Sequence, residues 1–237
     1  MNVIVLAAGC GKRFGTELPK QYLLLNNKPV LFYSLKVFEK SPLVKSISVV
    51  ISQNAQNLYD DFIRHYKNNF TKLTPPIFGG KERRDSVFNA MSELSKNFIP
   101  DDNLIAIHDS ARPLLSNNLL DNLYKTAKEF GGAVPALPLT DTVKEVDEND
   151  FIIANPIREK LKAVQTPQIF DFAEYWNAIQ ICEKKNIPVT DDSETFSCFS
   201  SKKVKLIPGD SRLFKITYKE DIEQAEKIIN KDNEWKF

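Results

Sequence analysis

Short apolar runs alternate along the chain with longer segments in which apolar residues recur at helical spacing. The short runs predict buried strands, and the longer segments predict helices. Continuous apolar strands that alternate with helices are typical of a parallel sheet covered on both faces, so we expect a doubly wound, mostly parallel α/β fold. The expected strands span residues 3–6, 47–51, 76–78, 104–107 and 133–137, and the expected helices span residues 31–39, 55–66, 117–130 and a segment that begins near Glu82.

The pattern changes after residue 138. Residues 142–146 and 151–154 flank a polar turn and predict a β-hairpin. Because an isolated hairpin is marginally stable in water, it must pack on its own domain or on another subunit. Beyond it we expect a final group of elements and then a polar tail, 230–237, that frays. That group consists of a helix over 172–184, strands over 204–207 and 213–216, and a helix over 219–230.

Composition narrows the classes of function. The 237 residues fit one large domain, and 32 basic residues balance 31 acidic ones. This balance does not favour nucleic acid or a membrane surface as a partner. Three cysteines without a CxxC pair indicate a reducing compartment. Without a signal-like segment or a run of 18 apolar residues, we expect no membrane span and a cytoplasmic location.

The candidate chemistry lies in residues 6–22, which follow the first strand. Ligands of doubly wound sheets bind at the carboxyl ends of strands, and glycines there let backbone N–H groups approach phosphates. Three cations, Lys12, Arg13 and Lys20, accompany Gly9 and Gly11. The loop therefore predicts polyphosphate binding. The alternative is a tight strand-to-helix turn whose basic side chains are merely solvated.

Two commoner phosphate loops do not fit. In the dinucleotide fingerprint a third glycine would stand where this chain has Phe14. In the Walker loop a Ser or Thr would follow Gly11-Lys12, where this chain has Arg13.

An ordered set of motifs resembles the cytidylyltransferases that act on 2-C-methyl-D-erythritol 4-phosphate in non-mevalonate isoprenoid synthesis. The resemblance covers nearly the whole chain and implies a Rossmann-like nucleotidyltransferase fold with CTP as the nucleotide. Its motifs are Leu6-Ala7-Ala8-Gly9-x-Gly11-x-Arg13, Pro19-Lys20-Gln21-Tyr22, Gly79-Gly80-x-Glu82-Arg83-x-x-Ser86-Val87, His108-Asp109-Ser110-Ala111-Arg112-Pro113, Asp141-Thr142-Val143-Lys144, Arg158, Thr166-Pro167-Gln168, Thr190-Asp191-Asp192 and Lys215-Ile216-Thr217.

The resemblance implies a reaction in which a substrate phosphate attacks the α-phosphorus of CTP and pyrophosphate leaves. Catalysis then depends on positioning and electrostatics. Arg13, Lys20 and Lys215 are the implied catalytic cations, and Lys12 is either a fourth or only solvated. The implied nucleotide-binding residues are Ala7, Ala8, Gly9, Gly11, Gly79, Gly80, Ser86 and Ser110. The chain departs from the family at Lys81, where the family often has Asp.

Asp109 follows an expected strand and is a candidate ligand for Mg²⁺, which takes one or two carboxylates plus phosphates and waters. Arg112 would help to hold this site or the substrate. Without the resemblance, the alternative is that Asp109 caps a helix and pairs with a structural arginine. His108 is expected to be a packed, hydrogen-bonded residue rather than a base.

The hairpin resembles the family's arm, at about residues 139–159, which exchanges between the subunits of a homodimer. Thr142 and Arg158 would then bind the acceptor phosphate in the partner's active site, together with Thr166 of the main domain. The guanidinium fork of arginine suits a phosphate. The alternative is a surface hairpin that packs on its own subunit.

Three other functions remain open. A ribitol-5-phosphate cytidylyltransferase of cell-wall polymer synthesis would share the loop and the nucleotide. A non-catalytic nucleotide-binding regulatory module could use the same fold, because fold does not fix function. A dehydrogenase is disfavoured by Phe14.

Overall fold

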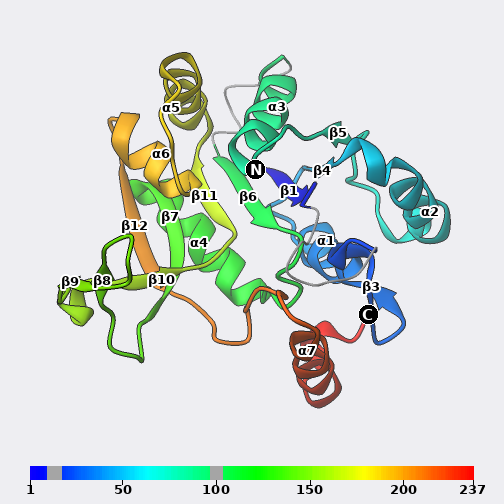
Figure 1. Cartoon of the computed structure of the whole chain (residues 1–237). Helices are drawn as coiled ribbons and strands as arrows, with labels where there is room; N and C mark the ends of the chain where they lie inside the picture. Colours follow the sequence, from blue (N-terminus) through cyan, green and yellow to red (C-terminus); the bar gives the residue numbers. More distant parts are fainter. Residues whose placement is uncertain (10–17, 97–103) are drawn as a thin grey trace.

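A mixed eight-stranded sheet runs through the centre of the molecule (Figure 1). The computed structural model describes residues 1–9, 18–96 and 104–237. Two strands, β10 (Lys162–Val164) and β11 (Gln168–Asp171), run antiparallel to their neighbours. The parallel strands are β1 (Asn2–Ala7), β4 (Ser46–Ile51), β5 (Ile77–Phe78), β6 (Leu104–Asp109), β7 (Gly131–Pro138) and β12 (Lys203–Pro208). The expected mostly parallel sheet is confirmed.

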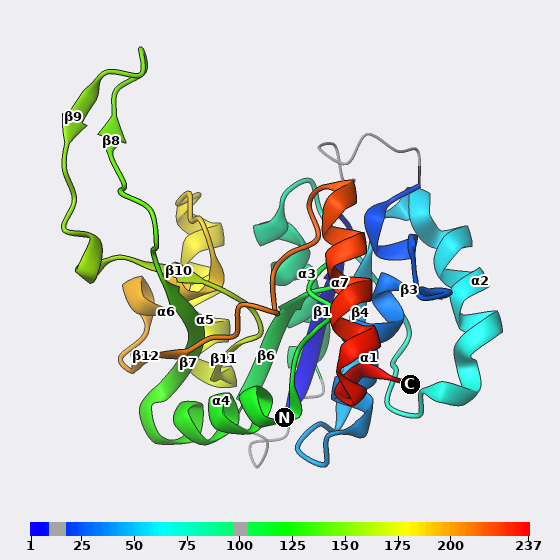
Figure 2. The ribbon, with the colours of Figure 1, turned by 90° about the horizontal axis from the view of Figure 1, so that it is seen from below.

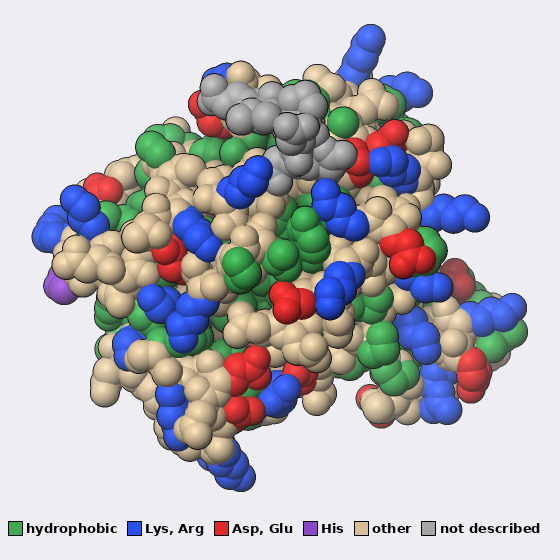
Figure 3. Space-filling view, turned by 180° about the vertical axis from the view of Figure 1, so that it is seen from behind, with side chains coloured by type: hydrophobic (Ala, Val, Ile, Leu, Met, Phe, Trp, Pro, Cys, Tyr) green, Lys and Arg blue, Asp and Glu red, His purple; other side chains and the backbone are tan. Residues whose placement is uncertain are grey.

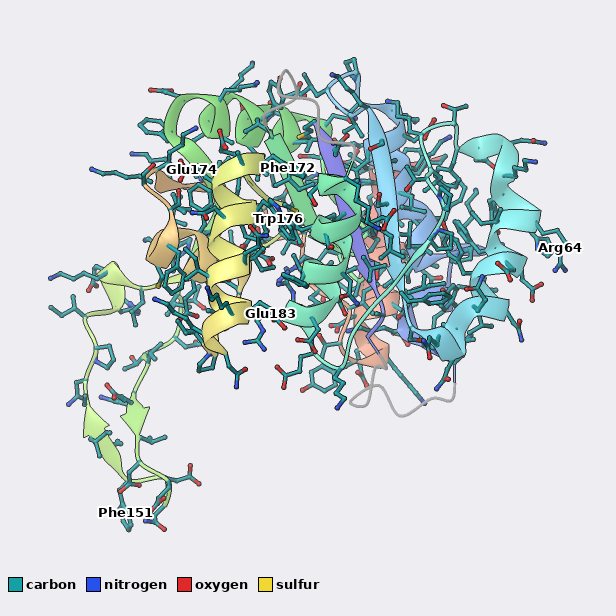
Figure 4. The ribbon with its side chains drawn as sticks, turned by 90° about the horizontal axis from the view of Figure 1, so that it is seen from above. Arg64, Phe151, Phe172, Glu174, Trp176 and Glu183 are labelled. Carbon is teal, nitrogen blue, oxygen red and sulfur yellow. The ribbon has the colours of Figure 1, made fainter. Side chains whose placement is uncertain are left out.

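Helices cover both faces of this sheet (Figure 1), as expected for a doubly wound fold. Alternate residues of β1 show the division, because Val3 and Val5 join one apolar cluster and Ile4 joins the other. Side chains of α1 (Val30–Lys40), α2 (Gln56–Tyr66), α4 (Asn117–Phe130) and α7 (Lys219–Lys231) belong to the first cluster. Those of α3 (Arg83–Ser95), α5 (Phe172–Lys185) and α6 (Asp192–Phe199) belong to the second. Trp176 points from α5 toward α3 (Figure 4), where its ring lies 5.6 Å from that of Phe88.

The predicted hairpin is present as an arm that projects from the sheet on the side of its carboxyl ends (Figure 2). Its strands, β8 (Glu145–Val146) and β9 (Ile152–Ala154), are shorter than the sequence pattern suggested. The carboxylate of Asp147 closes the turn by accepting the backbone N–H groups of Asn149 and Phe151. A short hairpin, β2 (Leu24–Leu25) with β3 (Lys28–Pro29), precedes α1.

Two expectations about the C-terminal part are wrong. Residues 213–216 form no strand, and side chains of other segments bind the carbonyls of Leu213 and Ile216 in place of a neighbouring strand. The tail does not fray. It ends in a short 3-10 helix, Asn233–Trp235, in which Trp235 is fully buried and its indole N–H donates to Leu115 O over 2.8 Å.

The molecule seen from behind carries Lys and Arg side chains scattered among Asp and Glu (Figure 3). No helix in the described part of the chain is long and apolar enough to span a bilayer.

Candidate active site

The sheet register brings four strand ends to one edge. Leu6 pairs with Asp109, Ala7 with Ile51, and Ile51 with Phe78. The segments that follow β1, β5 and β6 therefore start side by side, as ligand-binding segments do in doubly wound sheets. Helix α3 also begins at this edge, with Arg83 as its first residue.

The predicted nucleotide-binding residues after β1 and β5 are in contact. A Cβ atom placed on Gly79 would lie 2.6 Å from Ser86 Oγ and 2.8 Å from the Cβ of Ala8, so only glycine fits there. The Ser86 hydroxyl accepts the N–H of Gly80 at 3.2 Å and donates to Glu82 O at 3.1 Å. The structure thus joins Ala8 and Gly79, which are 71 positions apart in sequence, into one small-residue surface.

The base of the first loop is held by a residue of its own motif. Gln21 is buried, and its side-chain amide donates to Ala7 O over 2.5 Å and to Gly9 O over 3.4 Å. Ser110 is also buried, and its N–H donates to Leu6 O. The predictions for Gly11, Lys12 and Arg13 lie outside the described residues.

Asp109 is the centre of the charged half of the site. Lys215 Nζ donates to Asp109 Oδ2 over 2.8 Å, and Arg112 Nε lies 3.9 Å from the same oxygen. Arg83 Nε faces the other oxygen, Oδ1, at 3.5 Å. Burial would raise the pKa of Asp109, but the Arg83, Lys215 and Arg112 cations hold it well below its usual range. Asp109 is therefore an anion surrounded by an excess of positive charge.

Lys215 reaches this centre because its segment is fastened to the rest of the site. The N–H of Ile216 donates to Ala111 O over 2.8 Å. Leu213 O accepts Arg112 at 2.9 Å and the side-chain amide of Gln165 at 3.2 Å. Lys20 Nζ donates to Ile216 O over 2.8 Å. Lys20 thus binds the segment that carries Lys215, although the two predicted catalytic lysines are 195 positions apart in sequence.

Thr166 and His108 support Asp109 from the sheet. Thr166 Oγ1 accepts the N–H of Asp109 at 3.0 Å and lies 3.1 Å from His108 Nδ1. The other ring nitrogen of His108 lies 3.1 Å from Arg112 O. His108 is fully buried, and burial lowers its pKa to about 4. A neutral, fully bonded ring agrees with the expected packing role.

Sequence reasoning gave no role to Arg83 and Asp192, although both lie in the motifs. Arg83 Nη2 donates to Asp192 Oδ2 over 2.6 Å, and Asp192 Oδ1 accepts the Tyr175 hydroxyl at 2.7 Å. Asp192 opens α6, which the pattern of apolar residues did not reveal. The only signal was the presence of both residues in the motif set.

The structure does not bring Thr142 and Arg158 to Asp109 within one chain. Both are exposed on the arm, and Arg158 donates to Thr140 O at the arm's base. Phe151 marks the arm's tip, which points away from the sheet (Figure 4). Within residues 1–9, 18–96 and 104–237, no group of three His, Cys, Asp or Glu side chains is arranged to hold a metal ion.

Comparisons with known proteins identify one family of similar sequences over nearly the whole chain. The family model for 2-C-methyl-D-erythritol 4-phosphate cytidylyltransferase matches residues 1–231. A relative of that name from Desulforamulus reducens is 36% identical over 98% of this chain and 97% of its own length. Another, from Lachnospira eligens, is 37% identical over 94% of this chain and 96% of its own.

Solved structures are similar over the same extent. The 4-diphosphocytidyl-2C-methyl-D-erythritol synthase of Anaerococcus prevotii superimposes with a TM-score of 0.80 at 26% identity and covers 97% of both chains. The 2-C-methyl-D-erythritol 4-phosphate cytidylyltransferase of Francisella tularensis gives a TM-score of 0.77 at 28% identity, over 95% of this chain and 98% of that one.

Proposed function

Because the chain belongs to the 2-C-methyl-D-erythritol 4-phosphate cytidylyltransferase family, we propose that it transfers CMP from CTP to 2-C-methyl-D-erythritol 4-phosphate and releases pyrophosphate. The observation that carries this proposal is the excess of positive charge around Asp109. Three cations surround one carboxylate at the edge of the sheet where phosphates bind. The small-residue contact of Ala8, Gly79 and Ser86 lies at the same edge and suits a base and ribose.

The transfer forms one bond and breaks another at the α-phosphorus. A phosphate oxygen of the acceptor attacks, and the oxygen that bridges to the β-phosphate leaves with the pyrophosphate. Lys20 and Lys215 stabilise the negative charge that gathers around the α-phosphorus. Lys20 is held by the carbonyl of Ile216, and Lys215 is held by the carboxylate of Asp109. Arg13 remains a prediction from the sequence for the same role.

We assign Asp109 and Arg112 to the acceptor, with Thr166 holding Asp109 in place. Asp109 accepts hydrogen bonds from hydroxyl groups of the acceptor, because it is anionic and its neighbours orient it. Arg112, whose Nε lies 3.9 Å from Asp109 Oδ2, adds positive charge that would attract the phosphate of the acceptor.

Mg²⁺ would accompany the triphosphate. The described residues hold no group of three possible metal ligands, so Asp109 would contribute one carboxylate and phosphate oxygens and water would supply the other ligands. The ion would neutralise part of the charge on the triphosphate. Mg²⁺ should therefore bind measurably to the enzyme with CTP and only weakly to the enzyme alone, which calorimetric titration of both samples tests.

The arm supports a homodimer. Its exposed side chains include Val146, Phe151, Ile152, Ile153 and Ile157, and Phe151 is 70% exposed. Apolar side chains on a projecting hairpin favour burial against a second copy of the chain. In that dimer, Arg158 and Thr142 would reach the acceptor in the partner's active site.

Mixing two inactive variants tests this exchange. Lys215→Gln damages the main part of the site, and Arg158→Ala damages the arm. If arms exchange, a hybrid dimer has one intact site, and an unfolded and refolded mixture should regain about a quarter of the wild-type activity. If each arm served its own subunit, the mixture would stay inactive. Each variant refolded alone is the control.

The choice of acceptor is decided by pyrophosphate release from CTP. We expect turnover with 2-C-methyl-D-erythritol 4-phosphate and little with ribitol 5-phosphate. Turnover of ribitol 5-phosphate alone would overturn the proposed acceptor. Absence of turnover with both, despite CTP binding, would instead indicate a nucleotide-binding module.

A further inference from the structure

An alternating series of charged and polar groups leads away from Asp109 into the second apolar cluster. Lys215 binds Asp109 Oδ2, Arg83 faces Asp109 Oδ1, Asp192 binds Arg83, and Tyr175 binds Asp192. These five residues come from the C-terminal segment, β6, α3, α6 and α5. The series therefore joins four separate elements to a carboxylate of the active site.

Two hydrogen bonds, from Arg83 and Tyr175, hold the side chain of Asp192 in place. Its side chain is 4% exposed, and each of its oxygens has one partner, Arg83 or Tyr175. Tyr175 is fully buried with its ring stacked on Phe170 at 5.1 Å. Burial raises the pKa of Tyr175 well above its usual value, so the hydroxyl stays protonated and donates. A buried, doubly bonded carboxylate holds the guanidinium of Arg83 in one orientation.

The orientation of Arg83 matters because Arg83 and Lys215 face different oxygens of the Asp109 carboxylate. One oxygen of Asp109 is committed to Lys215, and Arg83 lies 3.5 Å from the other. At that distance Arg83 attracts the carboxylate without forming a short hydrogen bond, so Oδ1 can still accept one. Cations on two sides fix the plane of the carboxylate.

We propose that Arg83, Asp192 and Tyr175 are positioning residues that orient Asp109 Oδ1 toward the acceptor. The inference rests on the proposed function, in which Asp109 binds the acceptor. It adds that acceptor affinity depends on two residues of α5 and α6, which lie behind the site and touch no substrate.

The neighbouring Arg84 supplies a matched control. It lies one position further along α3 and donates to Ile187 O over 2.8 Å, a contact outside the series. Arg84→Gln should therefore leave both Michaelis constants unchanged, although it removes the same charge from the same helix turn.

The experiment compares the KM for each substrate in Asp192→Asn, Tyr175→Phe, Arg83→Gln, Arg83→Lys and the Arg84→Gln control. Asp192→Asn should raise the KM for methylerythritol phosphate about tenfold, the effect of losing one hydrogen bond between charged groups, and leave the KM for CTP within about twofold. Tyr175→Phe, which keeps the stacked ring, should give a smaller shift in the same direction. Arg83→Lys should recover part of the loss caused by Arg83→Gln.

A double-mutant cycle separates this inference from the function it rests on. Asp109→Asn alone should raise the KM for the acceptor, and adding Asp192→Asn should then have little further effect, because both act through one carboxylate. If Asp109→Asn has its effect but Asp192→Asn and Tyr175→Phe have none, the positioning network is wrong and the proposed function stands. Equal rises in both KM values, or additive effects in the cycle, would also overturn the network. If Asp109→Asn leaves the acceptor KM unchanged, both the assigned role of Asp109 and the positioning network are wrong.

Discussion

The charged centre around Asp109 and the arm that carries Phe151 are built in opposite ways. At the centre, a buried anion is surrounded by partners from α3, the turn after β6 and the C-terminal segment. In the arm, the hydrogen bonds are local, between residues of one hairpin, and the apolar side chains face solvent.

This difference shows what each region needs. Burying a charge is unfavourable unless partners compensate it, so the centre depends on tertiary structure within one chain. The arm meets its hydrogen-bonding needs by itself and leaves its apolar surface uncovered, so it depends on a second chain. Damage to the centre should therefore affect chemistry and folding, whereas loss of the arm's apolar side chains should affect assembly.

The largest effect is expected at Lys215. Lys215→Gln should lower kcat/KM by about 10²- to 10³-fold, as the loss of one transition-state contact does, with dimerisation unchanged. Pyrophosphate release and sedimentation measure the two properties. Lys219→Gln, which changes an exposed lysine at the start of α7, is the control. Dissociation of the Lys215→Gln dimer would show that the two regions are coupled.

His108 should make the stability of the centre depend on pH. The folded state keeps the ring neutral down to about pH 4, whereas the unfolded chain takes up the proton near pH 6.5. The contribution is thus fully present above pH 6.5 and is lost as the pH falls to about 4. The free energy of unfolding should decrease by about 3 kcal/mol over this interval through His108 alone.

Urea unfolding at a series of pH values checks this. His108→Gln should flatten the decline, and His65→Gln, which removes the exposed histidine of α2, should not. An unchanged slope in His108→Gln would mean that the unfolding equilibrium does not involve this proton.

Loss of the arm's exposed apolar side chains should weaken the dimer. Replacing Phe151 and Ile153 by Asp removes apolar surface that a partner would cover, which should weaken the dimer by about 2 kcal/mol or more. Sedimentation equilibrium should show a shift toward monomer. The thermal unfolding midpoint of the variant monomer should stay close to that of wild-type protein diluted until it dissociates. Glu148→Gln in the exposed turn is the control. A dimer of wild-type strength would assign the interface to another surface.

The smallest effect is expected at Asp147. Asp147→Ala removes the acceptor of two backbone N–H groups in the turn, a local loss of about 1 kcal/mol. Hydrogen exchange should accelerate at Asn149 and Phe151 and stay unchanged at β6. Faster exchange in β6 would contradict the independence of the arm.

Much of the fold and part of the site could be predicted because the determinants are local in sequence. The end of an apolar strand located Asp109, and small residues after two strands located Ala8 and Gly79. Lys215 was found through resemblance alone, since its segment has no regular structure to place it. Arg83 received no role because its partners, Asp109 and Asp192, are brought near it only by tertiary folding. Trp235 lay in a polar tail, and nothing local showed that the first apolar cluster would bury it.

The bond between Lys20 and the carbonyl of Ile216 has a consequence for synthesis of the protein. A growing chain that has left the ribosome as far as β12 already contains the sheet, the arm and the small-residue surface. It still lacks Lys215 and the segment that fastens Lys20. An incomplete copy can therefore contain every strand of the sheet and yet lack the arrangement of cations, which forms only when the last part of the chain joins the first.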